Sequence, residues 1–343
     1  MVSHRTTFSV RVLLFTLLIA ISYSAASQDE KIKPKDEEYV EVIQPLIGLR
    51  PFVQQHIDFF TIGDKEGREN SLAYRSASGL NIGGEFMFKF LRFSYQRNIP
   101  LKQPIQAGDF TPRFQQFGFG IEGRIFGMNM SYSEYSGFVL QNEKLLTDTL
   151  YSDLNAEKYR SDIRARSFNA SMRWTFSKNV SAKALFEQSE RQLKSAGAFT
   201  FLIAERFVKF QNDSSFVPFY ERAGYSETGD MTEMWINNVQ FMFGYGYVAA
   251  FGQGNWNMGL FLYTGSGPQV RQWTDDRGEH RHWKFPAVVK GRGGLGYNGK
   301  YVYTRLTAEM DYTTIGMTDS RMRWWEMFWE FSIGIRLYDP NEK

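Results

Sequence analysis

The sequence of 343 residues contains no cysteine and only four histidines. The lack of cysteine excludes disulfides, thiol catalysis, cysteine-ligated metals and a lipoprotein anchor. His4 lies in the N-terminal leader described next, so His56, His280 and His282 are the histidines left for chemistry. Side chains that commonly carry catalysis are therefore scarce.

Long apolar runs are also lacking. The best one, residues 12–21, has about half the length that a membrane-spanning helix needs. Arg5 and Arg11 precede it and small residues at 24–27 follow, which is the pattern of a secretory signal peptide. We expect residues 1–27 to be cleaved after Ala26 or Ser27 during secretion across the inner membrane. A retained N-terminal anchor is the alternative.

Neither sign of charge dominates. The chain has 40 Lys and Arg against 37 Asp and Glu, and two of the basic residues lie in the leader. Proteins that bind nucleic acid usually carry a strongly basic face. The sequence therefore predicts no nucleic acid partner.

Aromatic residues, in contrast, are abundant. They make up 17% of the chain, which also has 30 glycines, yet the mean hydropathy is only −0.39. This combination is unusual for a soluble core and typical of strands with one face in lipid and one in a polar interior. Two soluble domains or an all-β sandwich are the alternatives.

Alternation with a period of two is clearest near the C-terminus. There, Met327, Trp329, Phe331, Ile333, Ile335 and Leu337 alternate with Phe328, Glu330, Ser332, Gly334 and Arg336. Successive side chains of a strand point to opposite faces, so one face is apolar and the other small or charged. The sequence predicts an all-β fold, a transmembrane antiparallel up-and-down β-barrel.

Strand-like segments recur along most of the chain. Thirteen candidates are 49–61, 72–88, 91–97, 113–123, 126–138, 162–176, 180–189, 195–207, 234–250, 255–265, 286–297, 300–315 and 326–338. Bacterial barrels of one chain normally have an even number, so we predict about 12 strands, with 14 as the alternative. The miscounted segment is expected around Ser215 to Tyr220. The predicted domains are a periplasmic lead-in at 28–48, a barrel at 49–338 and a tail at 339–343.

The connections predict short turns at one rim and long loops at the other. Asn298-Gly299 suits a two-residue type I′ turn, and Gln253-Gly254-Asn255 is a second compact turn. Exposed polar loops are predicted at 98–112, 141–161, 208–233 and 266–284. The sidedness of the loops between 208 and 284 stays open.

Charges that alternate with apolar residues should face the lumen, because a charge in hydrocarbon costs a few kcal/mol. The predicted lumen charge network consists of Glu85, Glu122, Arg124, Lys290, Arg292, Arg305, Glu309, Asp311, Glu330 and Arg336. Paired charges of this kind fit a salt-bridged filling of a narrow barrel. A water-filled conducting lumen, or a site at the barrel mouth, is the alternative.

Aromatic residues near strand ends are expected to form girdles at the two membrane interfaces. The candidates are Trp235, Tyr245, Tyr247, Trp256, Trp324, Trp325 and Trp329.

One loop combines residues that could act as acid, base or metal ligand. It contains Asp275, Asp276, His280 and His282. An ordinary solvated loop is the alternative, and two histidines at i and i+2 point to one side only in a strand. No Ser–His spacing singles out a nucleophile, and no phosphate-binding loop occurs. We expect no cofactor and no metal.

Several segments resemble a family of predicted outer-membrane barrels of unknown function from Bacteroidota. They are Leu-Ala-Tyr-Arg at 72–75, Gly-Leu-Asn-Ile-Gly-Gly at 79–84, Phe-Lys-Phe-Leu-Arg-Phe-Ser at 88–94, Glu-Arg-Gln-Leu-Lys-Ser-Ala-Gly at 190–197 and Gly-Tyr-Gly-Tyr at 244–247. The resemblance covers most of residues 40–338. It implies the outer membrane of a diderm bacterium and supplies no catalytic residues. Barrel subunits of Bacteroidota secretion and gliding machinery are broader look-alikes.

Together these features favour a non-enzymatic barrel with a structural or accessory role in the cell envelope. Its expected partners are outer-membrane lipid, lipopolysaccharide and envelope proteins that contact its loops. A narrow channel for small solutes or ions is the first alternative, and an outer-membrane hydrolase with the loop Asp/His site is the second.

Overall fold

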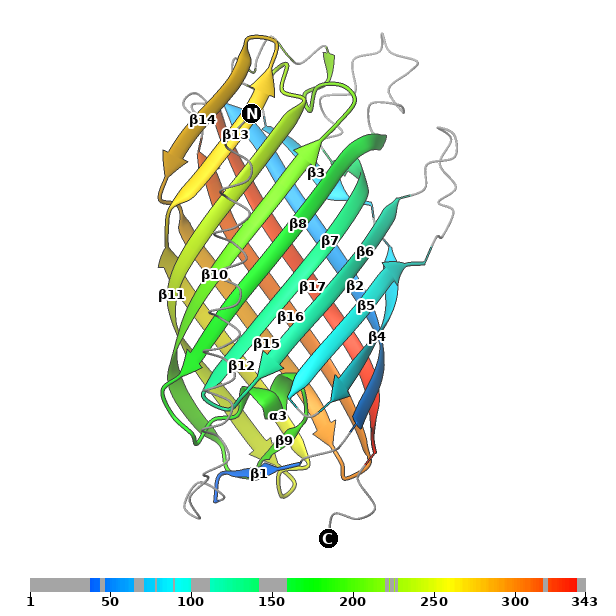
Figure 1. Cartoon of the computed structure of the whole chain (residues 1–343), viewed down its shortest axis with the longest axis vertical. Helices are drawn as coiled ribbons and strands as arrows, with labels where there is room; N and C mark the ends of the chain where they lie inside the picture. Colours follow the sequence, from blue (N-terminus) through cyan, green and yellow to red (C-terminus); the bar gives the residue numbers. More distant parts are fainter. Residues whose placement is uncertain are drawn as a thin grey trace, which may run out of the picture.

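A computed structural model describes residues 38–43, 47–64, 71–77, 79–88, 90–99, 112–141, 159–219, 222, 225, 228–316 and 320–337. These residues form an antiparallel β-barrel with a ring of 12 strands, as predicted (Figure 1). The first and last ring strands pair over most of their length and close the barrel. Among the described residues, no helix has the length and apolar character to cross a bilayer. The predicted signal peptide and C-terminal tail lie outside this part of the chain.

The ring strands follow one another around the barrel in chain order. They are β2 (Ile47–Asp64), β4 (Leu80–Phe88), β5 (Leu91–Asn98), β6 (Arg113–Glu122), β7 (Phe126–Leu140), β8 (Tyr159–Thr175), β10 (Ala196–Gln211), β11 (Glu233–Phe251), β12 (Trp256–Ser266), β15 (Ala287–Asn298), β16 (Val302–Gly316) and β17 (Ser320–Leu337).

Shorter elements complete the two ends. At the upper end of Figure 1, β3 (Ser71–Ser76) pairs with β2 and β7, and β13 (Gln269–Asp275) pairs with β11 and β14 (Gly278–Lys284). At the lower end lie α3 (Ala182–Phe186) and a small sheet of β1 (Val40–Val42) and β9 (Glu190–Gln192). Within the predicted lead-in, β1 thus pairs with β9 of the connection between β8 and β10. The predicted loop at 266–284 is wrong, because most of it forms β13 and β14.

The alternation in sequence becomes the two faces of the wall. The apolar set of β17, Met327 to Leu337, is 40–49% exposed, whereas Ser332 and Arg336 are 1% and 3% exposed. Val302, Leu306 and Met310 of β16 also face outward. Outward apolar side chains form a belt around the lower part of the barrel.

Aromatic pairs mark the two limits of this belt. Trp256 lies against Tyr297 at the lower limit, and Trp325 lies against Tyr312 at the upper limit, with ring centroids 5.2 Å apart in both pairs. Trp324 was predicted to join a girdle, but its side chain is buried inside the barrel. The prediction failed because Trp324 is one residue out of phase with the outward set.

The strands are longer than the membrane requires. A spanning strand needs about 9–11 residues, whereas β11 has 19 and β17 has 18. Above the belt the outward positions turn polar, as with the exposed ion pair of Arg166 and Glu134. The barrel therefore extends beyond the belt at its upper end.

The upper lumen is filled by an apolar cap, which we define as the buried cluster around Phe60 and Phe216. Phe60 contacts the rings of Tyr74, Phe138 and Phe210, with centroids 4.9–5.4 Å away. Phe216 comes from the connection between β10 and β11, and the Tyr74 hydroxyl donates a 2.5 Å hydrogen bond to its carbonyl. The predicted loop at 208–233 is present over the described part of residues 212–232, where no strand occurs, but residues 215–218 are buried rather than exposed.

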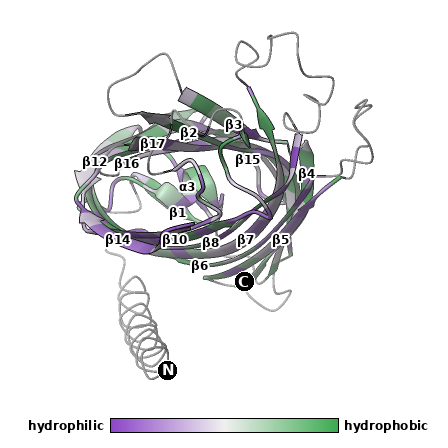
Figure 2. Cartoon of the chain, turned by 90° about the horizontal axis from the view of Figure 1, so that it is seen from above, coloured by the Kyte–Doolittle hydropathy of each residue, from purple (hydrophilic) through white to green (hydrophobic). Residues whose placement is uncertain are grey.

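The lower lumen is filled by a plug, which we define as residues 176–195, the connection between β8 and β10. Figure 2 shows α3 and β1 within the outline of the ring. Ser181 caps α3 by accepting a hydrogen bond from the Ala184 amide at 2.9 Å. The predicted strand at 180–189 is therefore wrong. It is the segment that raised the count to thirteen.

Glycines in the wall make room for the plug. A Cβ on Gly294 would meet the Leu185 side chain at 3.2 Å, and one on Gly296 would meet the Gln188 amide at 1.8 Å. Both positions face inward, and larger side chains there would displace the plug.

The two predicted compact turns had different outcomes. The turn at 252–255 is present, with positive φ at Gly252, Gln253 and Gly254. The type I′ turn at Asn298-Gly299 is wrong, because Asn298 ends β15 and pairs with Tyr303 without a positive φ. The Asn298 side chain instead donates a 2.5 Å hydrogen bond to the Glu190 carbonyl of the plug.

Candidate functional site

A polar chamber of about 230 Å³ lies in the lumen between the cap and the plug. Eight strands contribute charged side chains to its wall, while Ser131, Asn169 and Ser171 line another part. Cations and carboxylates alternate along the charged wall, so most charges are paired in a small enclosed volume.

All ten residues of the predicted lumen charge network point into the barrel, but they form separate groups. Lys290 contacts Glu309 at 2.6 Å and Asp311 at 3.6 Å, and Arg292 contacts Glu309 at 3.3 Å. These four side chains come from adjacent positions on β15 and β16. The register in which β15 pairs with β16 is sufficient to bring these four side chains together.

A second group lies lower in the chamber. Arg305 pairs with Glu330, and Arg50 contacts Glu85 at 2.5 Å. Arg92 then links Glu85 at 3.7 Å to Glu187 of the plug at 3.0 Å. Charges on the wall therefore hold the plug.

The other members of the predicted network also anchor the lower end. Glu122 pairs with Arg173, and Arg124 contacts Glu190 of the plug at 3.3 Å. Arg336 donates hydrogen bonds to the carbonyls of Gly299 and Gln188. Two members of the predicted network, Arg124 and Arg336, therefore attach the plug to the barrel directly.

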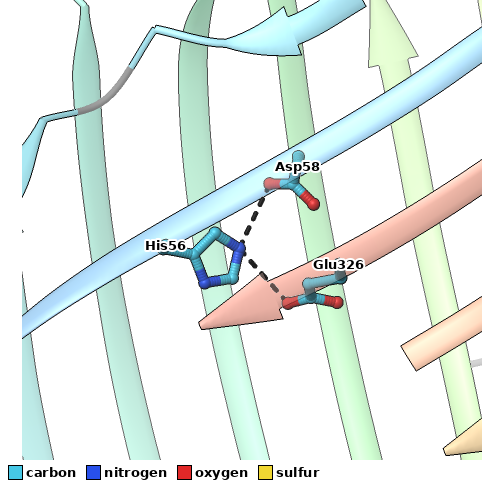
Figure 3. A group of neighbouring side chains, drawn as sticks. All are labelled: His56, Asp58 and Glu326. Atoms are coloured by element: carbon cyan, nitrogen blue, oxygen red, sulfur yellow. Dashed lines mark hydrogen bonds and ion pairs between the residues drawn. The ribbon is translucent and has the colours of Figure 1, made fainter. Parts of the chain in front are cut away.

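The most compact group of potential ligands is His56, Asp58 and Glu326 (Figure 3). His56 Nε2 lies 3.2 Å from Asp58 Oδ2 and 3.3 Å from Glu326 Oε1. The three ligand atoms all lie within 4.8 Å of one another. His56 and Glu326 line the chamber just below the cap.

Neighbouring side chains fix the orientation of this group. Trp324 Nε1 donates a 3.3 Å hydrogen bond to the second oxygen of Asp58, and Arg206 contacts the second oxygen of Glu326. The Arg206 guanidinium also lies over the Trp324 ring at 3.6 Å. The His56 ring stacks on Phe114, with centroids 5.0 Å apart. One oxygen of each carboxylate is left facing the imidazole.

Sequence reasoning missed this group, together with Arg50, Arg92, Arg173 and Arg206. The available signal was the alternation of β2, where Arg50, Gln54, His56 and Asp58 share the inward face. Glu326 lies opposite Asp58 on β17, and that pairing is set by closure of the barrel. The sequence therefore indicated that His56 and Asp58 face inward, but it did not indicate that Glu326 lies beside them.

The predicted loop site at Asp275, Asp276, His280 and His282 lies in the β13–β14 hairpin. His280 Nε2 is 3.0 Å from Asp275 Oδ1, and both histidine rings contact Trp273 at 5.1 Å. Asp276 is at the turn. Because β14 is a strand, the two histidines do share a side, and they pack on a buried tryptophan.

We expect acid to loosen this hairpin. Burial raises the pKa of Asp275, but hydrogen bonds from His280 and the Arg277 amide outweigh it, so its pKa lies below the usual value. The resulting stabilisation is present above pH about 4 and is lost as the pH falls through the folded pKa. Hydrogen exchange of residues 269–284, corrected for intrinsic rates, should speed up at acid pH. Asp275→Asn should abolish that dependence, and persistence of the dependence in this variant would contradict the assignment. Asp276→Asn is the matched control and should retain it.

Several solved structures are similar to this chain at low sequence identity. The outer membrane protease OmpT from Escherichia coli is 5% identical, with 85% of this chain and 96% of that chain covered and a TM-score of 0.35. The toluene transporter TodX from P. putida is 9% identical, with 85% and 90% covered and a TM-score of 0.30. The attachment invasion locus protein Ail of Yersinia pestis is 7% identical, with 83% and 98% covered and a TM-score of 0.21. These TM-scores lie below 0.5, and no function is inferred from them.

No curated protein matches the sequence at a significant level. One family model does match, over residues 34–334, which include all the strands of the barrel wall except the last residues of β17. The match therefore covers the belt, the chamber and the plug together. The protein belongs to this family, which is described as a domain of unknown function (DUF4421).

Proposed function

We propose that this protein is an integral outer-membrane β-barrel with a closed lumen and a non-enzymatic structural or accessory role in the envelope of a diderm bacterium. The observation that carries the proposal is that the chain fills its own lumen at both ends. Phe60 and Phe216 lie in the apolar cap, and Arg336 and Arg124 hold the plug. A barrel closed in this way offers a surface to its partners and does not offer a pore.

The exterior supports the membrane location. Outer-membrane barrels carry an apolar band between aromatic girdles, and the belt likewise lies between the Trp256–Tyr297 and Trp325–Tyr312 pairs. Short turns in such barrels face the periplasm, so the end with the plug would be periplasmic. Lipid and lipopolysaccharide are the proposed partners of the belt. A cleaved signal peptide and a Bacteroidota origin follow from the sequence pattern and the resemblance.

Envelope proteins would contact the upper surface. Trp283 of β14 and the neighbouring Phe285 are 61% and 72% exposed, and Arg281 lies over the Trp283 ring at 5.8 Å. Clustered exposed apolar side chains mark interaction surfaces. The predicted partner loop at 141–161 lies almost entirely outside the described residues.

A gated narrow channel is the second candidate, and the nature of the plug favours it. The plug is attached by ion pairs and hydrogen bonds, such as Arg92 to Glu187 and Gln188 to the Thr304 carbonyl. Water can replace such contacts at modest cost. The chamber above the plug already has charged walls.

Conductance in a planar bilayer separates the two candidates. We expect the refolded protein to give no steady stepwise current, because both the cap and the plug block the lumen. Correct folding is checked by its tryptophan fluorescence and by strand content in circular dichroism. Stepwise current from folded protein would overturn the closed-lumen proposal and favour the channel.

The absence of cysteine allows a second test of closure. Ser171→Cys places a single thiol in the chamber wall, where a charged thiol reagent should react slowly from either side. Adding Gly294→Leu and Gly296→Leu should displace the plug and raise the labelling rate from the lower side by at least about tenfold. Gly291→Leu with Gly293→Leu is the matched control, because a Cβ at these positions meets no atom closer than 3.4 Å. Fast labelling without the plug substitutions would contradict closure.

A further inference from the structure

We propose that His56, Asp58 and Glu326 form a binding site for one divalent transition-metal ion, with Zn²⁺ the best match. Imidazole nitrogen and carboxylate oxygen are common ligands of this ion. The proposal is independent of whether the barrel conducts, and it departs from the sequence-based expectation of no metal.

The spacing of the ligand atoms fits a metal. Ligands about 2.0–2.1 Å from Zn²⁺ at tetrahedral angles lie about 3.3–3.4 Å apart. His56 Nε2 is 3.2 Å from the Asp58 oxygen and 3.3 Å from the Glu326 oxygen. Both distances match an edge of the tetrahedron, and the Asp58 and Glu326 ligand oxygens lie within 4.8 Å of each other.

Hydrogen bonding alone accounts poorly for the same geometry. His56 presents one nitrogen to two carboxylates, and that nitrogen carries at most one hydrogen. Asp58 and Glu326 are also direct partners in the pairing of β2 with β17. Like charges directly opposite each other destabilise a strand pair. A cation held between the three side chains resolves both problems.

The surrounding charges leave room for that cation. Four carboxylates, Asp58, Glu326, Asp311 and Glu309, lie along this wall. Three cationic side chains form ion pairs with these carboxylates. Arg206 contacts Glu326 and Asp311. Lys290 contacts Glu309 and Asp311, and Arg292 contacts Glu309. One negative charge therefore remains without a fixed cation, which leaves a place for a cation within this group.

The carboxylates are also oriented as metal ligands usually are. Ligating side chains are normally held by further hydrogen bonds, which fix the lone pairs that face the metal. Trp324 and Arg206 hold the second oxygens of Asp58 and Glu326, as described above. The chamber, which His56 and Glu326 line, offers space for a water molecule as a fourth ligand.

The test is the metal content of the refolded barrel. Because the chamber is closed, Zn²⁺ is supplied during refolding, and weakly bound ions are then removed with a chelator. We expect about one Zn²⁺ per chain, falling at least tenfold in His56→Ala and in Glu326→Gln. The double variant His280→Ala/His282→Ala should retain the ion and is the matched control, since it removes the hairpin histidines. Refolding with Co²⁺ should give the strong visible absorption of a tetrahedral site only when His56 is present.

Each outcome decides the proposal. Wild type without Zn²⁺, or equal Zn²⁺ in wild type and His56→Ala, overturns it. Loss of Zn²⁺ in the His280→Ala/His282→Ala variant would assign the ion to the hairpin and overturn it as well. If His56→Ala does not fold, Glu326→Gln decides, because that substitution keeps the side-chain shape and removes only the charge.

Discussion

Replacing Glu330 by alanine is expected to lower the free energy of unfolding by about 3–5 kcal/mol. Glu330 is the partner of Arg305, and both side chains are nearly inaccessible to water. Their removal from water is costly, and the ion pair offsets that cost only while both partners are present. Glu330→Ala would leave the Arg305 charge buried, with Arg50 of the neighbouring pair close by. The measurement is equilibrium unfolding by urea in lipid vesicles, followed by tryptophan fluorescence.

Two further variants distinguish a lost ion pair from general disruption. Arg305→Met combined with Glu330→Met should recover most of the loss, because it removes both charges and keeps the volume. Arg166→Ala breaks the exposed pair with Glu134, 3.3 Å long, and should cost about 1 kcal/mol or less. A cost below about 1 kcal/mol for Glu330→Ala would mean that water in the chamber solvates Arg305 freely.

Phe60→Ala is expected to cost about 3–5 kcal/mol and to open the cap. The Phe60 side chain is fully buried and contacts the rings of Tyr74, Phe138, Phe210 and Phe216. Its removal leaves a cavity at the centre of the cap, with no neighbouring backbone free to collapse into it, because the strands are held by the ring. The same urea unfolding measures the loss, and the thiol at Ser171→Cys measures access from the upper side.

The matched control for this variant lies on the other face of the wall. Phe331→Ala removes the same side chain from a position that is 44% exposed on the belt. It should cost clearly less and leave the thiol slow to react. Equal effects of the two variants on labelling would mean that the cap does not close the upper end.

The strand count and the two faces of the wall were within reach of the sequence. In β16 and β17, for example, Glu309, Asp311 and Glu330 each lie between two outward apolar or aromatic residues, and that pattern is local and has a period of two. The hairpin β13–β14 was missed because its residues, such as Glu279, Arg281 and Lys284, are polar on both faces. Above the belt neither face meets lipid, and the signal that marks the other strands disappears.

The contents of the lumen could not be predicted in the same way. Residues 180–189 contain enough apolar side chains to suggest a strand, but Leu185 and Phe186 pack instead against a wall made accessible by Gly259 and Gly294. Likewise, nothing in the sequence around Phe216 and Val217 indicates that these two residues of the predicted loop lie within the cap. In both segments the residues they pack against are far away in the sequence, so no local sequence pattern predicts these contacts.

The sequence by itself determined that this chain forms a barrel of about twelve strands, which face faces lipid, and that the lumen is charged. Those properties follow from side chains that alternate along each strand, so they can be recognised from residues that are neighbours in the sequence. Only the tertiary structure decided that a cap and a plug occupy the lumen and that Asp58 meets Glu326 beside His56. These contacts depend on how the first strand pairs with the last, and the register of that closure is a property of the whole ring.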